Sequence, residues 1–227
     1  MNKKGEVKKK RKKISPENFL KQFSQRSSGF KILSSEITTS QLSDAMMKIN
    51  GETGVLEGLK PISDFKVFGK ATTVQTSADD WGTVIKGIYA AEKGDVLIIS
   101  CDDDNIAVWG ELASAAAKKQ GIAGTVVYGA SRDSSGIIDL DYPVFSKIVR
   151  PNAGKPLCKG EINKPIICGT TTVKTGDLIV GDECGVVSIP GEISSKVLKE
   201  AEDILKNENN IFKQLNKGKT FIDILNI

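Results

Sequence analysis

The chain has 227 residues, of which 39% are hydrophobic and 6% aromatic, which is enough apolar content for one large folded domain. Its formal net charge of +4 is unevenly distributed, because residues 1–13 carry +7 and the rest of the chain carries −3. The sequence contains no histidine, which excludes Ser-His-Asp and Cys-His catalysis and the usual histidine-ligated zinc sites. Proton transfer would therefore fall to Asp, Glu, Lys, Tyr, Cys or bound water.

The basic segment 1–13 is almost without apolar residues and is predicted to be a disordered tail, most simply a solvating one. A contact with nucleic acid or another anionic partner stays open, since clustered lysines can neutralise phosphates. Ile14-Ser-Pro-Glu17 follows the tail in place of an apolar segment, which argues against a secretory signal. No apolar run approaches the ~18 residues that a membrane span needs, so we expect no membrane association.

The four cysteines are widely spaced and form no CxxC pair: Cys101, Cys158, Cys168 and Cys184. Each has apolar neighbours in the sequence, which favours buried free thiols over a metal or redox site. Free thiols fit a reducing compartment, and we expect a cytoplasmic location.

Helix-start signals and apolar periodicity define the first elements. Ser15-Pro16 begins a predicted helix whose apolar stripe is formed by Phe19, Leu20 and Phe23. The next predicted elements are a helix at 39–47 bounded by Asn50-Gly51, a strand at 67–74, a helix at 80–91 and a strand at 96–99.

The second half of the chain continues with one helix and then several strands before a final helix. We expect a helix from about Val108 to Gln120, a strand at 125–128, further strands near 144–149, 166–172, 178–181 and 185–189, and a long amphipathic helix at 193–215. No internal repeat or clear linker interrupts this pattern. The sequence therefore predicts an α/β fold in a single domain over 14–227, with an N-terminal helical extension and a C-terminal helix.

A carboxylate at a helix start and an Arg-Asp pair after the next strand form the most informative motif. Twenty residues separate Glu111 from Arg132-Asp133. In a βαβ unit with a right-handed crossover, both points lie at the same edge of the sheet, where open α/β sheets bind ligands. Carboxylate oxygens suit a hard divalent cation, and a guanidinium suits an anionic organic ligand. Considered separately, Glu111 could be a carboxylate that is stabilised only by the dipole of its helix, and Arg132-Asp133 could be an ion pair in a loop.

The backbone beside Glu111 adds to this predicted site. Gly110 and the free amides of Leu112 and Ala113 form a helix N-terminus, which can bind a small carboxylate. The adjacent aspartates at 102–104 are rival metal ligands, although three consecutive loop carboxylates are more often solvated. The glycines match neither a P-loop nor a dinucleotide-binding fingerprint.

From about residue 37 to 220 the chain resembles the RraA-like family, which includes regulators of ribonuclease E activity and aldolases acting on 4-hydroxy-4-methyl-2-oxoglutarate and 4-carboxy-4-hydroxy-2-oxoadipate. The resemblance rests on these stretches in order: Leu42-Ser-Asp-Ala45, Gly69-Lys-Ala-Thr-Thr-Val74, Ala78-Asp-Asp-Trp81, Lys93-Gly-Asp-Val-Leu97, Trp109-Gly-Glu-Leu-Ala113, Gly129-Ala-Ser-Arg-Asp133, Pro143-Val-Phe-Ser-Lys147, Gly176-Asp-Leu-Ile-Val-Gly-Asp182 and Gly185-Val-Val. It implies a three-layer ββα sandwich of the swivelling-domain type, assembled as a homotrimer or a hexamer.

The aldolases of this family carry a D-x20-R-D motif, which here becomes Glu111-x20-Arg132-Asp133 with Glu in place of the first Asp. The resemblance implies that Asp133 binds Mg²⁺ or Mn²⁺ and that Glu111 holds metal-bound water. It further implies that Arg132 contacts the oxygen of pyruvate or its enolate, while the amides of Leu112 and Ala113, next to Gly110, bind the carboxylate.

The family also places carboxylates around a proton-donating water, and Asp44, Asp79 and Glu208 occupy similar positions here. Glu208 lies on the C-terminal helix and could reach the site of a neighbouring subunit. The expected function is a divalent-metal-dependent lyase that cleaves a 2-oxo acid to pyruvate by retro-aldol chemistry or decarboxylation, through an enolate stabilised by the metal and Arg132.

Two alternatives remain. One is a non-enzymatic regulator that binds a ribonuclease or RNA helicase, a role that the basic tail 1–13 would favour. The other is a role with sugar phosphates, because a related domain is fused to hexulose-phosphate synthase in some archaea.

Overall fold

The computed structural model describes residues 37–62 and 66–227. The basic tail predicted at 1–13 and the helix predicted from Ser15 lie outside the described residues, so both stay predictions. Residues 37–227 form one compact unit. No helix in the described ranges is long and apolar enough to cross a membrane.

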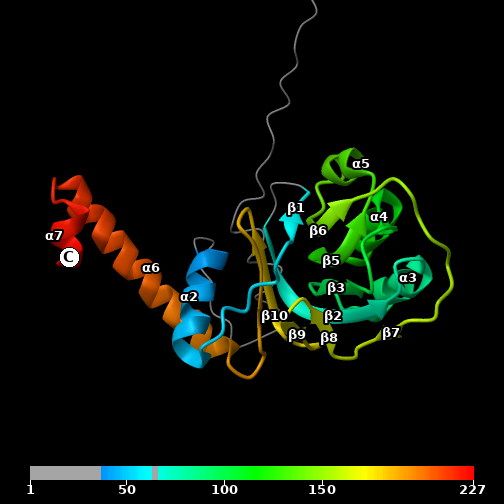
Figure 1. The fold of residues 1–227 in the computed structure, drawn as a ribbon, viewed down its shortest axis with the longest axis horizontal. Helices are drawn as coiled ribbons and strands as arrows, with labels where there is room; N and C mark the ends of the chain where they lie inside the picture. The colour runs from blue at the N-terminus through cyan, green and yellow to red at the C-terminus, as the bar shows by residue number, and fades with distance from the viewer. Residues whose placement is uncertain (1–36, 63–65) are drawn as a thin grey trace, which may run out of the picture. The chain divides into compact units, whose positions relative to one another are not determined.

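Helices and strands alternate in the first part of this unit, and a run of strands then precedes the C-terminal helices (Figure 1). In chain order they are α2 (Thr39–Asn50), β1 (Lys60–Pro61), β2 (Val67–Thr76), α3 (Trp81–Ala90), β3 (Val96–Cys101), β4 (Ala107–Trp109), α4 (Glu111–Gln120), β5 (Gly124–Ser131), α5 (Ser134–Asp139), β6 (Val144–Val149), β7 (Glu161–Ile162), β8 (Ile166–Cys168), β9 (Thr171–Val173), β10 (Leu178–Asp182), β11 (Gly185–Ile189), α6 (Ser194–Asn216) and α7 (Phe221–Leu225).

Nine strands form the main sheet, in the order β1-β6-β5-β3-β2-β10-β11, with β4 paired to β5 and β7 paired to β2. The central strands β2, β3, β5 and β6 run parallel, whereas β10 and β11 add antiparallel strands. The sheet curls until Gly181 of β10 lies against Phe145 of β6, where a Cβ on the glycine would come within 2.8 Å of the ring. Only glycine allows this approach, which nearly closes the sheet.

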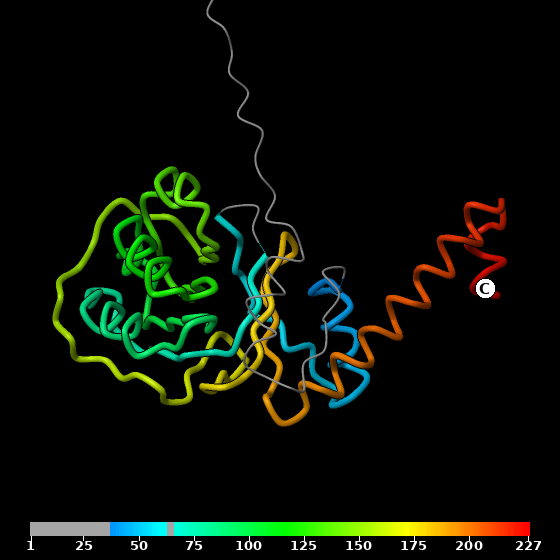
Figure 2. The backbone as a smooth tube through the Cα atoms, turned by 180° about the vertical axis from the view of Figure 1, so that it is seen from behind, coloured from blue at the N-terminus to red at the C-terminus, as the bar shows by residue number. Residues whose placement is uncertain are grey.

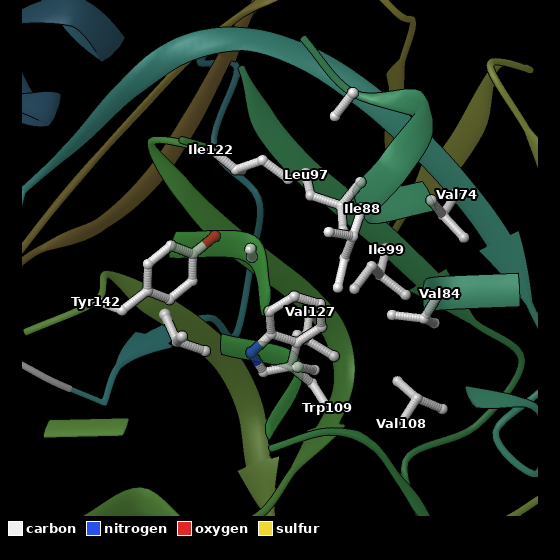
Figure 3. Packing of buried hydrophobic residues seen from close by; sticks show 14 of the residues in the cluster. Val74, Val84, Ile88, Leu97, Ile99, Val108, Trp109, Ile122, Val127 and Tyr142 are labelled. Carbon is white, nitrogen blue, oxygen red and sulfur yellow. The ribbon is translucent and has the colours of Figure 1, made fainter. Parts of the chain in front are cut away.

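Side chains from the two faces of the sheet enter two separate cores, because successive strand residues point to opposite faces. Leu97 and Ile99 of β3 pack with α3, α4 and α5, where Trp109 stacks near Tyr142 (Figure 3). Val96 and Ile98 point the other way, into a core shared with β8–β9 and β10–β11. A helical layer, the central sheet and a second β layer therefore form the expected three-layer α/β sandwich.

The helix α2 is tied to the β layer at its first residue. Thr38 and Gln41 form a capping box, and Gly51 ends the helix in the left-handed conformation. The buried carboxylate of Asp182 accepts hydrogen bonds from the amide and the hydroxyl of Thr39, at 2.8 and 2.7 Å. This anchor holds α2 at the turn between β10 and β11, and α6 packs along α2 (Figure 2).

The helix expected from about Val108 begins later than predicted, at Glu111. Val108 and Trp109 instead belong to β4, which pairs in parallel with β5 and buries both side chains. Gly110 then adopts an extended backbone with φ −165°, which ends the strand and caps α4. Val108 and Trp109 fit a helical pattern in the sequence. In the structure they are buried between the sheet and the helices, where they form a strand.

Other departures are smaller. The strand expected at 166–172 is a hairpin, β8–β9, because Gly169 turns the chain at φ 67°. The short helices α5 and α7 and the strands β1 and β7 were not predicted.

All four cysteines are free, but only part of the expectation of buried thiols is right. Burial raises the pKa of Cys101 and of Cys168 to about 12. Cys158 and Cys184 are exposed, contrary to the prediction, since both lie on connecting segments. Cys184 occupies the turn between β10 and β11, and Cys158 has a positive φ of 59°.

Candidate functional site

A pocket of about 180 Å³ opens where β4 and β5 end and α4 begins. Its lining residues are Trp81, Ile85, Ala107, Val108, Trp109, Gly110, Leu112, Ala113, Arg132, Asp133 and Ala153. β4 and β5 are parallel neighbours, so the start of α4 and the Arg132-Asp133 pair meet at the carboxyl edge of the sheet. The two segments lie together, as the sequence predicted. The strand that precedes α4 is β4, however, and not β3.

Gly110 allows this close approach. A Cβ at Gly110 would come within 2.6 Å of Asp133 Oδ2 and 3.0 Å of Arg132 Cγ. Any side chain at this position would therefore displace the Arg-Asp pair. The backbone amide of Glu111 points at the same Asp133 oxygen from 3.4 Å.

The backbone conformation and a backbone hydrogen bond fix the positions of Arg132 and Asp133. The amide of Arg132 donates to the carbonyl of Trp109 at 2.9 Å, and Asp133 takes a left-handed conformation with φ 59°. Arg132 Nε lies 3.3 Å from Asp133 Oδ2, and both side chains are partly exposed. Asp133 Oδ1 accepts no hydrogen bond from the described part of the chain, so one carboxylate oxygen is open to a ligand.

The first turn of α4 presents open amides beside this pair. Leu112 and Ala113 are the second and third residues of the helix, where backbone N–H groups have no intrahelical acceptor. Gly110 has no side chain to cap them. The arrangement offers two donors and a helix dipole to a small anion.

Glu111 does not lie in the pocket, although the motif predicted that it would. Its carboxyl group packs against the backbone of Gly136 at the start of α5, and it does not line the pocket. Its carboxylate and that of Asp133 therefore belong to two adjoining helix starts, those of α4 and α5.

The opposite wall of the pocket is apolar. Part of it belongs to residues 151–160, a segment that crosses the N-terminus of α3 and is called the strap below. Ala153 of the strap and Trp81 and Ile85 of α3 form this wall. The indole N–H of Trp81 donates to the carbonyl of Gly154 at 3.0 Å. The strap therefore fixes the position of the indole ring.

Asp80 holds the strap, a role that sequence reasoning missed. The fully buried carboxylate accepts hydrogen bonds from the amides of Cys158 and Lys159, both at 2.8 Å, and from the hydroxyl and amide of Thr83. Burial alone would raise its pKa, but these hydrogen bonds hold the pKa well below its ordinary value. An Asp before a helix in the sequence signals an N-cap, but nothing in the sequence signals its contact with the strap.

The three further carboxylates do not line this pocket. Asp79 is exposed and accepts from Ser77 Oγ at 2.6 Å. Asp44 lines a different cavity of about 300 Å³, between α2 and the β10–β11 turn. Glu208 accepts from Gln41 Nε2 at 2.5 Å, on the α2–α6 contact.

The aspartates at 102–104 contact their own loop and two neighbouring segments. Asp102 accepts from the amide of Ala78 at 2.8 Å, Asp103 accepts from the amide of Asn105 at 2.9 Å, and Asp104 lies 3.3 Å from Lys147 Nζ. None of the three aspartates lines the pocket that contains Arg132 and Asp133.

The donor set of the pocket suits a hard cation held through few protein ligands. Asp133 offers an open carboxylate oxygen, whereas the carboxyl group of Glu111 lies against Gly136 and does not line the pocket. Among the described residues, no three Cys, Asp or Glu side chains gather in a group that could hold a metal. Mg²⁺ fits such a site, because it usually keeps several waters and binds one or two carboxylates.

The chain matches the family model RraA-like, described as Aldolase/RraA, over residues 39–188. An uncharacterized protein of Methanocaldococcus jannaschii is 42% identical over 176 residues, which cover 76% of this chain and 85% of that protein. A protein of Halalkalibacterium halodurans, provisionally named a 4-hydroxy-4-methyl-2-oxoglutarate aldolase, is 39% identical over 168 residues, 73% of this chain and 79% of that protein.

The fold is also found in solved structures. An uncharacterized protein from Pseudomonas syringae pv. tomato aligns with a TM-score of 0.72 and 27% identity, covering 82% of this chain and 90% of that one. The family model spans α2 to β11, which includes both segments that form the pocket. The chain belongs to the RraA-like (Aldolase/RraA) family.

Proposed function

We propose that this protein is a lyase that cleaves a 2-oxo acid and releases pyruvate at the pocket between α4 and β5. The observation that carries the proposal is the convergence of Arg132, Asp133 and the open first-turn amides of α4 on one small cavity. The relative from H. halodurans, whose name assigns it provisionally to aldolases acting on 4-hydroxy-4-methyl-2-oxoglutarate, supports this choice of substrate class.

Each group has a role that follows from its chemistry. The amides of Leu112 and Ala113 bind the substrate carboxylate at the positive end of the α4 dipole. Arg132 donates to the 2-oxo oxygen, on which negative charge develops as the carbon–carbon bond breaks and its electron pair forms the enolate. The other fragment leaves as a carbonyl compound, whose hydroxyl proton passes to water, or as CO₂, and water returns a proton to the enolate carbon to give pyruvate. Asp133 holds the guanidinium in place through the contact at 3.3 Å.

The expected cofactor is Mg²⁺ or Mn²⁺, which Asp133 would hold directly and Glu111 through water. When bound, such an ion supplies positive charge that stabilises developing enolate charge. The apolar wall of Trp81, Ile85 and Ala153 reduces the access of water to the same region.

A pyruvate-release assay tests the proposal. The purified protein is supplied with oxaloacetate, 4-hydroxy-4-methyl-2-oxoglutarate and related 2-oxo acids, with Mg²⁺, with Mn²⁺ or with a chelator. We expect metal-dependent pyruvate release from at least one of them. Release that is absent for every substrate and metal would contradict the lyase and would favour the regulator expected as the alternative.

A further inference from the structure

The pocket that contains Arg132 and Asp133 is polar on one side and apolar on the other. Under the proposed function, the first-turn amides of α4 bind the carboxylate of the substrate and Arg132 binds its 2-oxo oxygen. The far end of the substrate, which leaves as the carbonyl fragment, then lies against the remaining lining residues. Apart from Gly110, these residues all have apolar side chains: Trp81, Ile85, Ala107, Val108, Trp109 and Ala153.

The two tryptophans of this apolar side use their polar groups within the protein. The indole N–H of Trp81 donates to the carbonyl of Gly154 at 3.0 Å, and the indole N–H of Trp109 donates to the hydroxyl of Ser114 at 2.8 Å. The strap that carries Gly154 is itself held by the buried carboxylate of Asp80. A ligand in the pocket therefore meets the apolar rings of the tryptophans and not their N–H groups.

The charges that line the pocket leave no partner for a second carboxylate. Within residues 37–62 and 66–227, Arg132 is the only cation that lines it, and its Nε already lies 3.3 Å from Asp133 Oδ2. Lys155 and Lys159 of the strap are exposed and do not line the pocket. A carboxylate at the far end of the substrate would therefore lose water without gaining a cation, and Asp133 would repel it.

Leu112 adds an exposed apolar side chain to the lining of the pocket. It is 82% exposed within the described part of the chain, although it is a large aliphatic residue. An aliphatic group bound in the pocket would cover part of this side chain and remove apolar surface from water, which is favourable. A carboxylate at the same place would gain nothing from this contact.

We propose that this pocket selects 2-oxo acids whose far end is an uncharged aliphatic group and rejects those that carry a second carboxylate there. The selection rests on the proposed function, since the roles of Arg132 and the α4 amides orient the substrate. The substrate class is then a 4-hydroxy-2-oxo monocarboxylic acid, which excludes 4-hydroxy-4-methyl-2-oxoglutarate because that acid has two carboxylates.

Cleavage of such an acid produces pyruvate and an aliphatic aldehyde or ketone. The bond between the third and fourth carbons breaks, and its electron pair forms the enolate of pyruvate. The proton of the 4-hydroxyl group passes to water as the fourth carbon becomes a carbonyl carbon, and water returns a proton to the third carbon.

Calorimetric titration in the presence of Mg²⁺ tests the selection without turnover. The probes are 2-oxohexanoate and 2-oxoadipate, which lack the hydroxyl group needed for cleavage. They differ only at the far end, which is a methyl group in the first and a carboxylate in the second. We expect the wild type to bind 2-oxohexanoate about tenfold or more tightly than 2-oxoadipate, because a carboxylate against the apolar side of the pocket has no partner.

A lysine placed in the apolar side should reverse this preference. Ile85→Lys adds a cation at a half-buried position that lines the pocket, so we expect this variant to bind 2-oxoadipate more tightly than 2-oxohexanoate. The matched control Ala90→Lys adds the same charge to the same helix at an exposed position outside the pocket and should keep the wild-type preference. Thermal melting checks the fold of the variants. If Ile85→Lys unfolds, Ala153→Lys adds the cation from the exposed strap with the same expected reversal.

Equal wild-type affinity for the two acids, tighter binding of 2-oxoadipate, or binding of neither would overturn the selection, as would a reversal in Ala90→Lys. Pyruvate release from 4-hydroxy-2-oxohexanoate and 4-hydroxy-2-oxoadipate separates this result from the proposed function. Release with equal kcat/KM from both would contradict the selection and support the lyase. A binding preference for 2-oxohexanoate without pyruvate release from either hydroxy acid would confirm the selection and contradict the lyase.

Discussion

Arg132 and Asp133 have different roles in the pocket, although they form one ion pair. Arg132 presents a planar set of donors to the cavity, whereas Asp133 keeps one oxygen open and uses the other to orient the guanidinium. Neither side chain is fully buried, so their ion pair contributes little to stability. Their effects should therefore appear in chemistry and binding rather than in the free energy of unfolding.

We predict that Arg132→Lys lowers kcat/KM for pyruvate release by the equivalent of about 3 kcal/mol, because a lysine offers a point charge in place of a bidentate fork. The melting temperature should change little, since a partly exposed ion pair contributes at most about 1 kcal/mol. Arg150→Lys is the matched control, because Arg150 contacts the carbonyl of Asp104 and does not line the pocket. A near-normal rate with a large drop in melting temperature would show that Arg132 is structural.

We predict that Asp133→Ala abolishes the metal-dependent activity and that added Mg²⁺ fails to restore it, because the site has few other protein ligands. Asp103→Ala, which removes an exposed carboxylate from the neighbouring loop, should respond to Mg²⁺ as the wild type does. Pyruvate release titrated with Mg²⁺ provides the measurement. Full activity of Asp133→Ala in chelator would exclude the proposed mechanism.

At the scale of elements, the pocket depends on one buried carboxylate that ties a strap to a helix. Asp80 caps α3 and at the same time receives the amides of Cys158 and Lys159. Because the strap supplies Ala153 and holds the indole of Trp81, the apolar wall of the pocket is built on this contact.

We predict that Asp80→Asn lowers the free energy of unfolding at pH 7 by about 2–4 kcal/mol, because an amide cannot accept all the hydrogen bonds that the carboxylate receives. The folded-state pKa of Asp80 is depressed, so its stabilising contribution is complete above the ordinary aspartate pKa of about 3.9. That contribution is lost as the pH falls below this value toward the folded-state pKa.

Denaturant unfolding between neutral pH and pH 3 should therefore show a steeper acid loss in the wild type than in Asp80→Asn. Asp79→Asn, which changes the exposed neighbour, should behave like the wild type. Identical acid profiles for the wild type and Asp80→Asn would refute this role of Asp80.

The sequence predicted where two segments of the chain meet, but not which carboxylates line the pocket, since Glu111 lies against Gly136 instead. The separation of Glu111 from Arg132-Asp133 predicted that the segments meet at one sheet edge, and they do, because β4 and β5 are parallel neighbours. The strand β4 itself was taken for helix, since three residues carry too little pattern to show a strand. The hydrogen bond from Cys158 to Asp80 could not be predicted from the sequence either, because it joins residues almost 80 positions apart.

For the whole molecule, the alternation of helices and strands predicted the α/β layers, but not the closure of the sheet. That closure depends on the long-range contact of Gly181 with Phe145. Asp44 and Glu208 lie on α2 and α6, away from the pocket of their own chain.

We predict that deleting residues 1–13 leaves the melting temperature and the rate of pyruvate release unchanged, because the segment has almost no apolar side chains with which to dock. Binding to RNA is measured alongside, on the full chain and on the truncated one. A tight RNA complex that disappears with the tail, in a protein that releases no pyruvate, would favour the regulatory alternative.

The most direct test of the central claim is calorimetric titration with oxalate, a planar mimic of the pyruvate enolate, in the presence of Mg²⁺. If Arg132, Asp133 and the start of α4 form the binding site, the wild type binds one oxalate per chain, Arg132→Lys binds it much more weakly, and Asp133→Ala loses the Mg²⁺-dependent binding. The control Arg150→Lys keeps wild-type affinity. Equal oxalate affinity in all four proteins, or no binding by the wild type, would contradict the assignment of this pocket.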